Sequence, residues 1–313
     1  METVQIGRDG LRASRLAFGC WRIPGTWTPS EVTRDAEAAG RAAVLAAVEA
    51  GYTLFDHADI YCIGEAERIF GQVLRENPGL RDRIVIATKC GIRRADDPAG
   101  APYRYDFSPA HIVRSCEDSL RRLGVETVDV YVLHRPDFLM DPAEVAGAFE
   151  SLRTSGKVRE FGVSNFASSQ VTALQRACPM PLVVNQVEIS LAHLSPFGDG
   201  TLDQCLAEGI VPMAWSPLAG GQLGDGPRRL LASQQGYRTD AINAALDVMA
   251  RERGVTRAAV ALAWLLRHPA RIVPIVGSTN PERIREAARA EALTMSREDW
   301  YRLLAVARDQ PLP

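Results

Sequence analysis

Side chains that can transfer a proton stand at the ends of three short apolar segments. The stretch TLFDHADIY, residues 53–61, begins as a strand pattern, closes it with Asp56 and reaches Tyr61 five residues later. Two further apolar segments end in Lys89 and His134. A polar group at the end of a buried strand is costly unless it is paired. The sequence therefore predicts that Asp56 and Lys89 are partners.

A phenol beside an ammonium group is suited to acid–base chemistry. An ordinary Tyr has a pKa near ~10 and is a weak proton donor at neutral pH. A nearby cation favours the phenolate, and a decrease of about two pKa units needs only ~2.7 kcal/mol. We therefore predict that Lys89, kept charged by Asp56, lowers the pKa of Tyr61. Neutral His134 is then expected to orient a carbonyl oxygen toward Tyr61.

A second stretch, PIVGSTNPERIREA at residues 274–287, has the features of an anion site. Asn280 is a helix N-cap with Pro281 at the first helical position, which puts Arg283 in the first turn. The N–H groups of a helix start, the hydroxyl of Ser278 and a guanidinium together attract a phosphate. An acid–base group and a phosphate site around one opening indicate a phosphorylated cofactor that spans both.

An alternation of apolar segments and helical stretches must position these residues. Several of the apolar segments are nearly continuous in Val, Ile and Leu, as expected for parallel strands covered on both faces. They lie at residues 16–19, 53–56, 84–89, 128–134, 161–165, 183–189, 211–215 and 272–277. Strands in this number, with helices between them, predict a closed (β/α)8 TIM barrel whose functional residues lie at the carboxyl ends of the strands.

Two of the intervening helices have clear start and stop signals. Ser108 and Asp141 are each followed by a proline, and both are predicted to be N-caps with Pro109 and Pro142 at the first helical position. Gly124 follows the apolar stripe of the first helix and is predicted to end it.

The chain is longer than the ~250 residues that such a barrel takes, which leaves room for additions. Residues 3–19 are expected to open with a β-hairpin that turns at Asp9–Gly10. Residues 296–309 predict an additional C-terminal helix. We interpret residues 1–313 as a single barrel domain. An open doubly wound sheet is the alternative, but the chain has no GxGxxG motif to support it.

Composition argues against several kinds of partner. The formal net charge of −2 gives no basic field that would attract nucleic acid or anionic lipid. The longest apolar run, residues 258–266, is too short to span a bilayer, and residues 1–10 lack the apolar core of a secretory signal. Six cysteines without metal-like spacing are expected to be free thiols. We therefore expect a cytoplasmic protein with no metal site that acts on a small molecule.

The order of the motifs in the chain resembles that in the aldo-keto reductase superfamily. The motifs are FDHADIY, ATKCG, VYVLHRPD, GKVREFGVSNF, NQVEIS, MAWSPLAGG and PIVGSTNPERIREA. The resemblance covers about residues 16–288 and looks closest to the bacterial NADP-dependent oxidoreductases. It implies a monomer that reduces an aldehyde or ketone carbonyl by hydride transfer from NADPH. In that reaction Tyr61 protonates the developing alkoxide.

The resemblance also implies roles for individual side chains. The catalytic tetrad falls on Asp56, Tyr61, Lys89 and His134. The nicotinamide carboxamide is held by Ser164, Asn165 and Gln186. The nicotinamide ring is expected to stack on Trp215. The pyrophosphate is expected to follow the next loop, at Ser216, Pro217 and Leu218. The adenosine end and its 2′-phosphate are held by Ser278, Asn280, Arg283 and Glu286.

The sequence departs from the family pattern at a few positions. Many members carry Lys where Gly277 stands and Asn where Ala287 stands. Arg283 nevertheless favours NADPH over NADH. His57 replaces a small residue that is common in the family motif, and it is expected either to narrow the site or to add a proton donor.

The substrate side of the site is expected to be built by loops. Trp21 and Trp27 are candidates for an apolar substrate wall, with Trp300 as a third. Trp27 lies in a Pro/Gly-rich loop of the kind that carries binding function. Loops at residues 22–35, 91–107 and 218–237 would complete the pocket, and the long polar loop at residues 91–107 is expected to order on binding.

Two other functions compete with carbonyl reduction. A Schiff-base lyase would use Lys89 as its nucleophile, a known use of lysines in barrels. It explains the paired Asp56 and the phosphate-binding Arg283 less well. A regulatory subunit that senses the bound cofactor, as relatives of the family do for channels, would keep the same residues but show little turnover.

Overall fold

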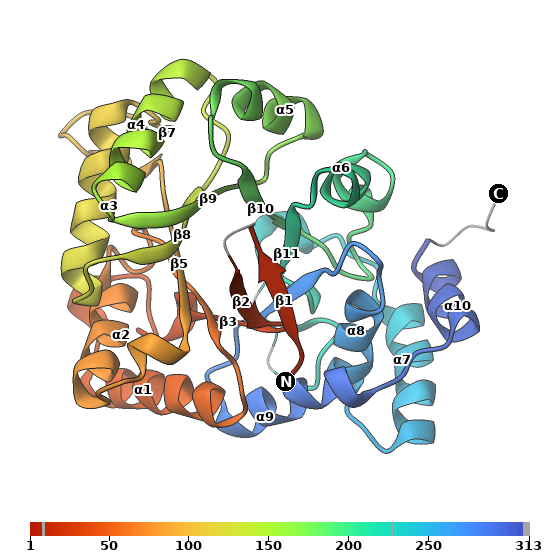
Figure 1. Cartoon of the computed structure of the whole chain (residues 1–313). Helices are drawn as coiled ribbons and strands as arrows, with labels where there is room; N and C mark the ends of the chain where they lie inside the picture. Colours follow the sequence, from red (N-terminus) through yellow and green to blue (C-terminus); the bar gives the residue numbers. More distant parts are fainter. Residues whose placement is uncertain (8–9, 227, 229, 309–313) are drawn as a thin grey trace.

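A computed structural model describes residues 1–7, 10–226, 228 and 230–308. Its parallel strands pair with their neighbours in chain order, and the last pairs with the first, so that the sheet closes into a barrel (Figure 1). The strands are β3 (Ala17–Gly19), β4 (Leu54–Asp56), β5 (Val85–Cys90), β8 (Val128–Leu133), β9 (Val158–Ser164), β10 (Leu182–Glu188), β11 (Val211–Trp215) and β12 (Val273–Val276). The predicted TIM barrel is confirmed, and the open-sheet alternative is wrong.

Helices surround the barrel and cover its strands (Figure 1). They are α1 (Arg34–Glu49), α2 (Glu65–Glu76), α3 (Pro109–Leu123), α4 (Pro142–Thr154), α5 (Ser168–Ala177), α6 (Thr201–Glu208), α7 (Asp240–Arg253), α8 (Arg257–Leu266), α9 (Pro281–Ala288) and α10 (Arg297–Arg308). The predicted N-cap of α4 is confirmed, because Asp141 accepts a hydrogen bond from the N–H of Ala143. Gly124 ends α3 with a φ of 68°, in the left-handed region that favours glycine.

The predicted N-terminal hairpin closes the bottom of the barrel. It consists of β1 (Thr3–Ile6) and β2 (Leu11–Ser14), which lie across the middle of the barrel in Figure 1. The predicted turn residue Asp9 lies outside the described residues. Apolar side chains of the hairpin pack together with barrel side chains from the amino ends of the strands: Val4, Ile6, Leu11 and Ala13 with Leu54, Val85, Val183, Val211 and Val273. The barrel interior is therefore closed at this end by a packed apolar plug.

The predicted C-terminal helix α10 is fastened to α8 by two tryptophans. The rings of Trp264 and Trp300 stack with centroids 5.0 Å apart and an interplanar angle of 7°. Each indole N–H donates to the other residue's carbonyl oxygen, at 3.1 and 3.0 Å. The expectation that Trp300 forms part of a substrate wall is wrong, because its ring packs on α8 and does not line the cavity described below.

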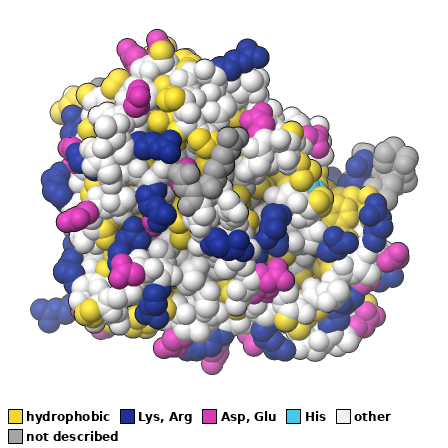
Figure 2. All heavy atoms as spheres, in the orientation of Figure 1, with side chains coloured by type: hydrophobic (Ala, Val, Ile, Leu, Met, Phe, Trp, Pro, Cys, Tyr) yellow, Lys and Arg dark blue, Asp and Glu magenta, His cyan; other side chains and the backbone are white. Residues whose placement is uncertain are grey.

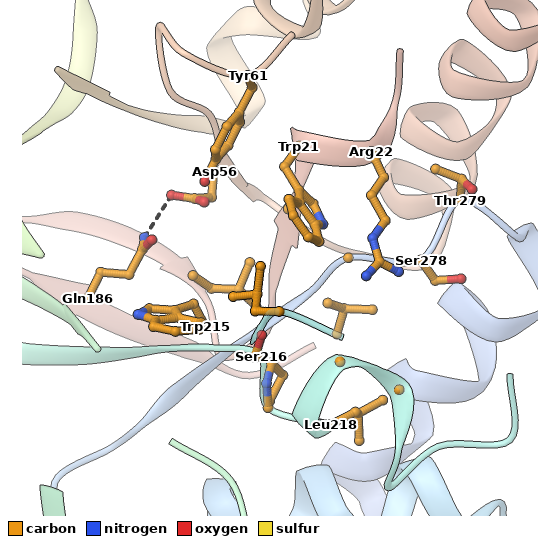
Figure 3. A pocket seen from close by; sticks show the side chains of 18 of the residues that line it. Trp21, Arg22, Asp56, Tyr61, Gln186, Trp215, Ser216, Leu218, Ser278 and Thr279 are labelled. Atoms are coloured by element: carbon orange, nitrogen blue, oxygen red, sulfur yellow. Dashed lines mark hydrogen bonds between the residues drawn. The ribbon is translucent and has the colours of Figure 1, made fainter. Parts of the chain in front are cut away.

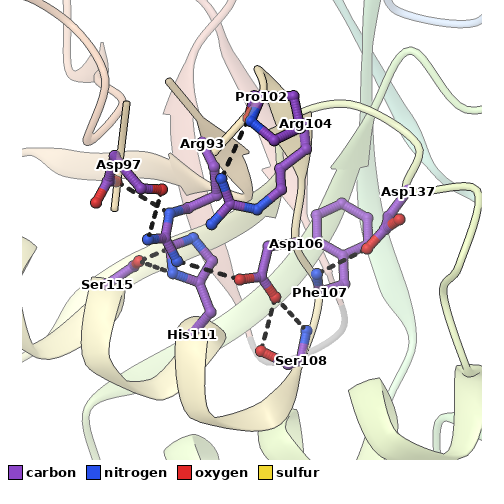
Figure 4. Close-up of polar contacts among 10 residues, drawn as sticks. All are labelled: Arg93, Asp97, Pro102, Arg104, Asp106, Phe107, Ser108, His111, Ser115 and Asp137. Atoms are coloured by element: carbon purple, nitrogen blue, oxygen red, sulfur yellow. Dashed lines mark hydrogen bonds and ion pairs between the residues drawn. The ribbon is translucent and has the colours of Figure 1, made fainter. Parts of the chain in front are cut away.

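A short antiparallel hairpin, which we call the flap hairpin, occupies residues 92–105. Its strands are β6 (Ile92–Arg93) and β7 (Arg104–Tyr105). Arg93 fastens it by donating to the carboxylates of Asp97, at 3.0 Å, and Asp106, at 3.2 Å (Figure 4). These contacts within the loop hold it in shape in the structure, and its ordering on binding stays a prediction.

Asp106 also binds the side chain of Ser108, the residue just before α3. Its Oδ1 accepts both the hydroxyl of Ser108, at 2.7 Å, and the backbone N–H of the same residue (Figure 4). Ser108 is the N-cap residue of α3 and Pro109 its first helical residue, as predicted, but the Ser108 side chain is bound to Asp106 and makes no capping hydrogen bond.

The surface carries both signs of charge. In Figure 2, basic and acidic side chains are interspersed over the visible face, in keeping with the formal net charge of −2. No helix in the described part of the chain has the length and apolar character needed to cross a membrane.

Candidate active site

A cavity of about 1000 Å³ opens at the carboxyl ends of the barrel strands. It receives side chains from the ends of β3, β4, β8, β9, β10, β11 and β12 and from the flap hairpin. Nearly all the predicted site residues line it: Trp21, Trp27, Asp56, Tyr61, His134, Ser164, Asn165, Gln186, Trp215, Ser216, Pro217, Leu218, Ser278, Asn280, Arg283 and Glu286. Lys89 is the exception, since it lies beneath the cavity floor, fully buried.

The predicted pair of Asp56 and Lys89 is present at the ends of the adjacent strands β4 and β5. The Nζ atom of Lys89 donates to Asp56 Oδ1 at 2.7 Å and to the carbonyl oxygen of His57 at 2.7 Å. Burial lowers the pKa of the Lys89 ammonium, and the attraction of Asp56 opposes this effect. Both side chains are buried, so the carboxylate fixes the position of the amine.

Tyr61 reaches the cavity because the chain turns sharply after it. Cys62 and Ile63 have φ values of 47° and 54°, and Gly64 follows with 86° before α2 begins. Such left-handed conformations are strained for residues other than glycine. Figure 3 shows the phenol directed toward Asp56. The Nζ atom of Lys89 lies 5.0 Å from the centroid of the Tyr61 ring.

The electrostatics of Tyr61 differ from the prediction. Burial raises its pKa well above the ordinary value, and the negative charge of Asp56 raises it further. The cation that acts in the opposite direction is Arg135. The prediction that Lys89 lowers the pKa of Tyr61 is therefore wrong for the cavity as it stands. The phenol keeps its proton well beyond neutral pH.

His134 follows β8, and its ring lies beside the phenol. The ring centroids of His134 and Tyr61 are 6.0 Å apart in an edge-on arrangement. Burial lowers the pKa of His134 well below its ordinary value, and the charges of Lys89 and Arg135 act in the same direction. The imidazole is therefore neutral at pH 7, as predicted, and can donate only one hydrogen bond.

A chain of hydrogen bonds runs along the cavity floor from Trp215 to Asp56. The indole N–H of Trp215 donates to Asn165 Oδ1 at 2.9 Å, and Asn165 Nδ2 donates to Ser164 Oγ at 2.8 Å. The Ser164 hydroxyl donates to the carbonyl oxygen of Gln186 at 2.8 Å. The Nε2 atom of Gln186 donates to Asp56 Oδ1, also at 2.8 Å (Figure 3). These contacts hold the indole and three amide or hydroxyl groups in fixed orientations around the floor.

The predicted anion site lies at the start of α9. Asn280 Oδ1 accepts the N–H of Arg283 at 3.1 Å, so the predicted N-cap is confirmed. Ser278 Oγ accepts the N–H of Asn280 at 3.2 Å. The Arg283 guanidinium extends to Gly226, where an added Cβ would come within 2.9 Å of its Nη1 atom. Backbone N–H groups, a hydroxyl and a guanidinium thus border the same end of the cavity.

The indole of Trp21 accounts for glycine at position 277. A Cβ added to Gly277 would lie 3.0 Å from the Nε1 atom of Trp21. The Trp21 ring in turn contacts Trp27, at 5.2 Å between centroids, and the guanidinium of Arg22, at 4.6 Å from ring centroid to Cζ. In Figure 3 this guanidinium is directed toward Ser278.

The loops expected to complete the pocket do contribute to it: residues 22–35, 91–107 and 218–237 all supply lining residues, among them Arg22, the flap residues Arg94, Asp96 and Tyr103, and Leu231. Arg135 lies outside these loops and was not predicted. Arg135 had one available signal, because it directly follows His134 in the motif VYVLHRPD. Within the flap hairpin no signal singled out individual residues, since this polar stretch shows no strand periodicity.

Both expected roles of His57 are wrong. Its ring is fully buried and packs against Phe70 of α2 at 4.5 Å between centroids, so it neither narrows the cavity nor faces it. Both ring nitrogens lack a hydrogen-bond partner in the described part of the chain. Burial and the charge of Lys89 lower the pKa of His57 to about 3.

The structure argues against a Schiff-base reaction at Lys89. A nucleophilic lysine must present an accessible, uncharged amine to a carbonyl. The Lys89 amine is instead fully buried and bound to Asp56.

Among the described residues, no group of three or more His, Cys, Asp or Glu side chains is placed to hold a metal ion.

Comparison with known proteins agrees with this arrangement. The model of the aldo/keto reductase family matches residues 15–308. The chain is 40% identical to 6-dehydroglucose reductase from Novosphingobium aromaticivorans, over 99% of this chain and 96% of that one. It is 42% identical to 6-dehydroglucose reductase from Agrobacterium fabrum, over 96% of each chain.

A solved structure shows the same architecture. The glycerol dehydrogenase from Gluconobacter oxydans superimposes with a TM-score of 0.85 and 27% identity, over 99% of this chain and 97% of that one. The match of the family model covers nearly the whole barrel, and both reductases align from end to end. The chain therefore belongs to the aldo/keto reductase family.

Proposed function

We propose that the protein reduces aldehydes or ketones to alcohols with NADPH, and that Tyr61 is the proton donor. The observation that carries this proposal is the buried pair of Asp56 and Lys89 beneath the Tyr61 ring, with neutral His134 beside it. Asp56, Tyr61 and His134 line one cavity, and Lys89 lies directly beneath its floor. Membership of a family of oxidoreductases supports the same assignment.

The two ends of the cavity suit the two ends of a dinucleotide. Trp215 offers an aromatic face beside Asn165 and Gln186 near the tetrad, and Arg283 with Ser278 borders the far end. We assign the first group to the nicotinamide and the second to the 2′-phosphate, since a guanidinium at a helix start suits a phosphate. NADPH bound in this way supplies the hydride for the reaction.

The protein's own residues supply position and a proton. Neutral His134 is placed to donate a hydrogen bond to the carbonyl oxygen and hold it near Tyr61. Because the pKa of Tyr61 is raised, its phenol is protonated at neutral pH, which is the form that a proton donor needs. An alkoxide is a much stronger base than a phenolate, so the transfer from Tyr61 is downhill. The positive charge of Arg135, which favours a lower pKa of Tyr61, is placed to stabilise the phenolate that remains.

Replacement of the phenolic hydroxyl tests the proposal. We expect Tyr61→Phe to lower kcat for carbonyl reduction by about 10²–10⁴-fold, the usual contribution of general acid catalysis. Its affinity for NADPH, measured by fluorescence titration, should stay within about threefold of wild type because the ring is retained. NADPH oxidation at the wild-type rate in Tyr61→Phe would refute the role of Tyr61.

The relatives suggest a class of substrate to test first. Two relatives at 40% and 42% identity are named 6-dehydroglucose reductase, so we propose a sugar-derived aldehyde. An NADPH-oxidation screen should include sugar aldehydes together with simple aldehydes, ketones, dicarbonyls and quinones. Tight NADPH binding with negligible turnover across the whole panel would instead favour a regulatory subunit.

A further inference from the structure

Arg135 faces the cavity at the point where the tetrad meets the substrate side. It directly follows His134, and the chain bends at Arg135, so that both successive side chains line the cavity. In an extended strand they would point to opposite faces. The Cζ atom of Arg135 lies 5.5 Å from the centroid of the Trp215 ring. The guanidinium therefore stands over the indole, next to the catalytic side chains.

The positive charge of Arg135 reaches the groups on both sides of it. It acts to lower the pKa of Tyr61 and His134 in the tetrad and of Tyr103 in the flap hairpin. Arg135 is thus close both to the proposed proton donor and to the flap hairpin.

No carboxylate neutralises this guanidinium. In the described part of the chain, Arg135 has no ion pair, and its recorded contact is with the Trp215 ring. Half-buried arginines elsewhere are paired: Arg93 with Asp106, Arg122 with Glu67 and Arg257 with Asp247. A guanidinium only donates hydrogen bonds, so a ligand that pairs with Arg135 must present an acceptor such as oxygen. The phosphate-binding end of the cavity has Arg283 for that purpose.

We propose that Arg135 binds an oxygen substituent on the carbon next to the reacting carbonyl, and that the protein prefers α-oxygenated carbonyl substrates. The inference rests on the proposed function, because it takes the reaction to occur between Tyr61 and Trp215. A hydroxyl and a carboxylate share the required chemistry, since each presents an oxygen acceptor. The carbonyl oxygen is directed to Tyr61 and His134, while the neighbouring oxygen accepts from Arg135.

Three aldehydes of nearly the same shape test this preference. In 2-methylpropanal the carbon next to the carbonyl bears two methyl groups. In 2-hydroxypropanal a hydroxyl replaces one of these methyl groups. In glyoxylate the neighbouring carbon is the carbon of a carboxylate, so that two oxygens stand where the methyl groups were. We expect wild-type kcat/KM for at least one oxygenated aldehyde to exceed that for 2-methylpropanal by about tenfold or more, the effect of a hydrogen bond to a charged group. The better of the two identifies which acceptor the site takes.

The variant Arg135→Met removes the charge and keeps the length of the side chain. In this variant, kcat/KM for the preferred oxygenated aldehyde divided by kcat/KM for 2-methylpropanal should fall close to 1. Arg135→Lys should keep part of the preference. The ratio cancels any change in Tyr61, because Tyr61 serves all three aldehydes alike at one pH. Arg104→Met is the matched control: this flap arginine does not line the cavity, so the wild-type ratio should be retained.

The outcomes separate this inference from the proposed function. Turnover of all three aldehydes with no preference in the wild type, or a preference that Arg135→Met leaves intact, overturns the role of Arg135 alone. Failure of the wild type to oxidise NADPH with these and all other carbonyls overturns the proposed function and this inference with it.

Discussion

Lys89 illustrates how burial sets the chemistry of single residues in this protein. Its pairing with Asp56 could be predicted, because both residues end adjacent strands and a buried charge needs a partner. The direction of the pKa of Tyr61 could not, because it depends on how much solvent the folded loop removes from the phenol. Arg135 was missed for a related reason, since its side chain enters the cavity only through a local bend of the chain.

Arg283 allows a test of cofactor choice at the residue scale. If it binds the 2′-phosphate, Arg283→Ala should raise the dissociation constant for NADPH about 10- to 100-fold, the range for a charge-assisted hydrogen bond. The constant for NADH, which lacks that phosphate, should change less than about threefold. Fluorescence titration of both nucleotides measures the two constants.

The same helix offers a matched control for this experiment. Arg285 is also in α9, but it pairs with Glu49 at 3.1 Å on the surface and does not line the cavity. Arg285→Ala should leave both dissociation constants unchanged. Equal weakening of NADPH and NADH by Arg283→Ala would count against the assignment of the 2′-phosphate.

At the scale of elements, the ends of the helices were easier to predict than the flap hairpin. Asp141 and Asn280 cap α4 and α9 as their sequence neighbours indicate, since each stands just before a proline. The flap hairpin has strands of only two residues each, too short to show alternation. Its shape comes from the side chain of Arg93, which joins residues that no local pattern brings together.

Two glycines within helices should respond to alanine in opposite directions. In α2, a Cβ added at Gly71 would lie 2.5 Å from the carbonyl oxygen of Arg122, because α2 and α3 approach closely there. Gly71→Ala should therefore lower the free energy of unfolding by about 1–3 kcal/mol, as overpacking does. In α4, Gly147 has open space around its Cα, so Gly147→Ala should raise it by up to ~1 kcal/mol through helix propensity.

Urea unfolding of the two variants beside the wild type gives both values. The pair is informative because each member makes the same chemical change in a helix interior. A stabilising effect of Gly71→Ala would mean that α2 and α3 are not in close contact at this point.

At the scale of the whole molecule, the closed barrel followed from counting apolar segments, and its strand order followed from the chain order. Convergence of the strand ends was therefore predictable, and so was the convergence of Asp56, His134 and Trp215 on one cavity. The packing beneath the cavity was not. His57 could be recognised as unusual, but only the fold shows that its ring is enclosed against Phe70.

The buried ring of His57 should make the stability of the whole protein depend on pH. Its pKa is about 3 in the folded state against an ordinary value of 6.5, so between these values the unfolded chain binds more protons. Stability that is complete above pH 6.5 is then lost as the pH falls toward 3, at up to ~1.4 kcal/mol per pH unit.

Comparison with His57→Met isolates this contribution. Met fills a similar apolar space and does not titrate. Urea unfolding gives the difference in free energy of unfolding between the variant and the wild type. Between pH 8 and pH 5 this difference should shift by about 2 kcal/mol in favour of the variant. Other titrating groups, such as His134, are common to both and cancel. Parallel curves between pH 8 and pH 5 would show that His57 is solvated or paired in solution.

The N-terminal hairpin has a practical consequence for handling the protein. It seals the barrel at the end away from the cavity, and the chain begins there. A molecule tethered to a bead or electrode through Met1 would face the support with its sealed end and turn its entrance toward the bulk liquid. Attachment at that point should therefore leave the diffusion of reactants unobstructed.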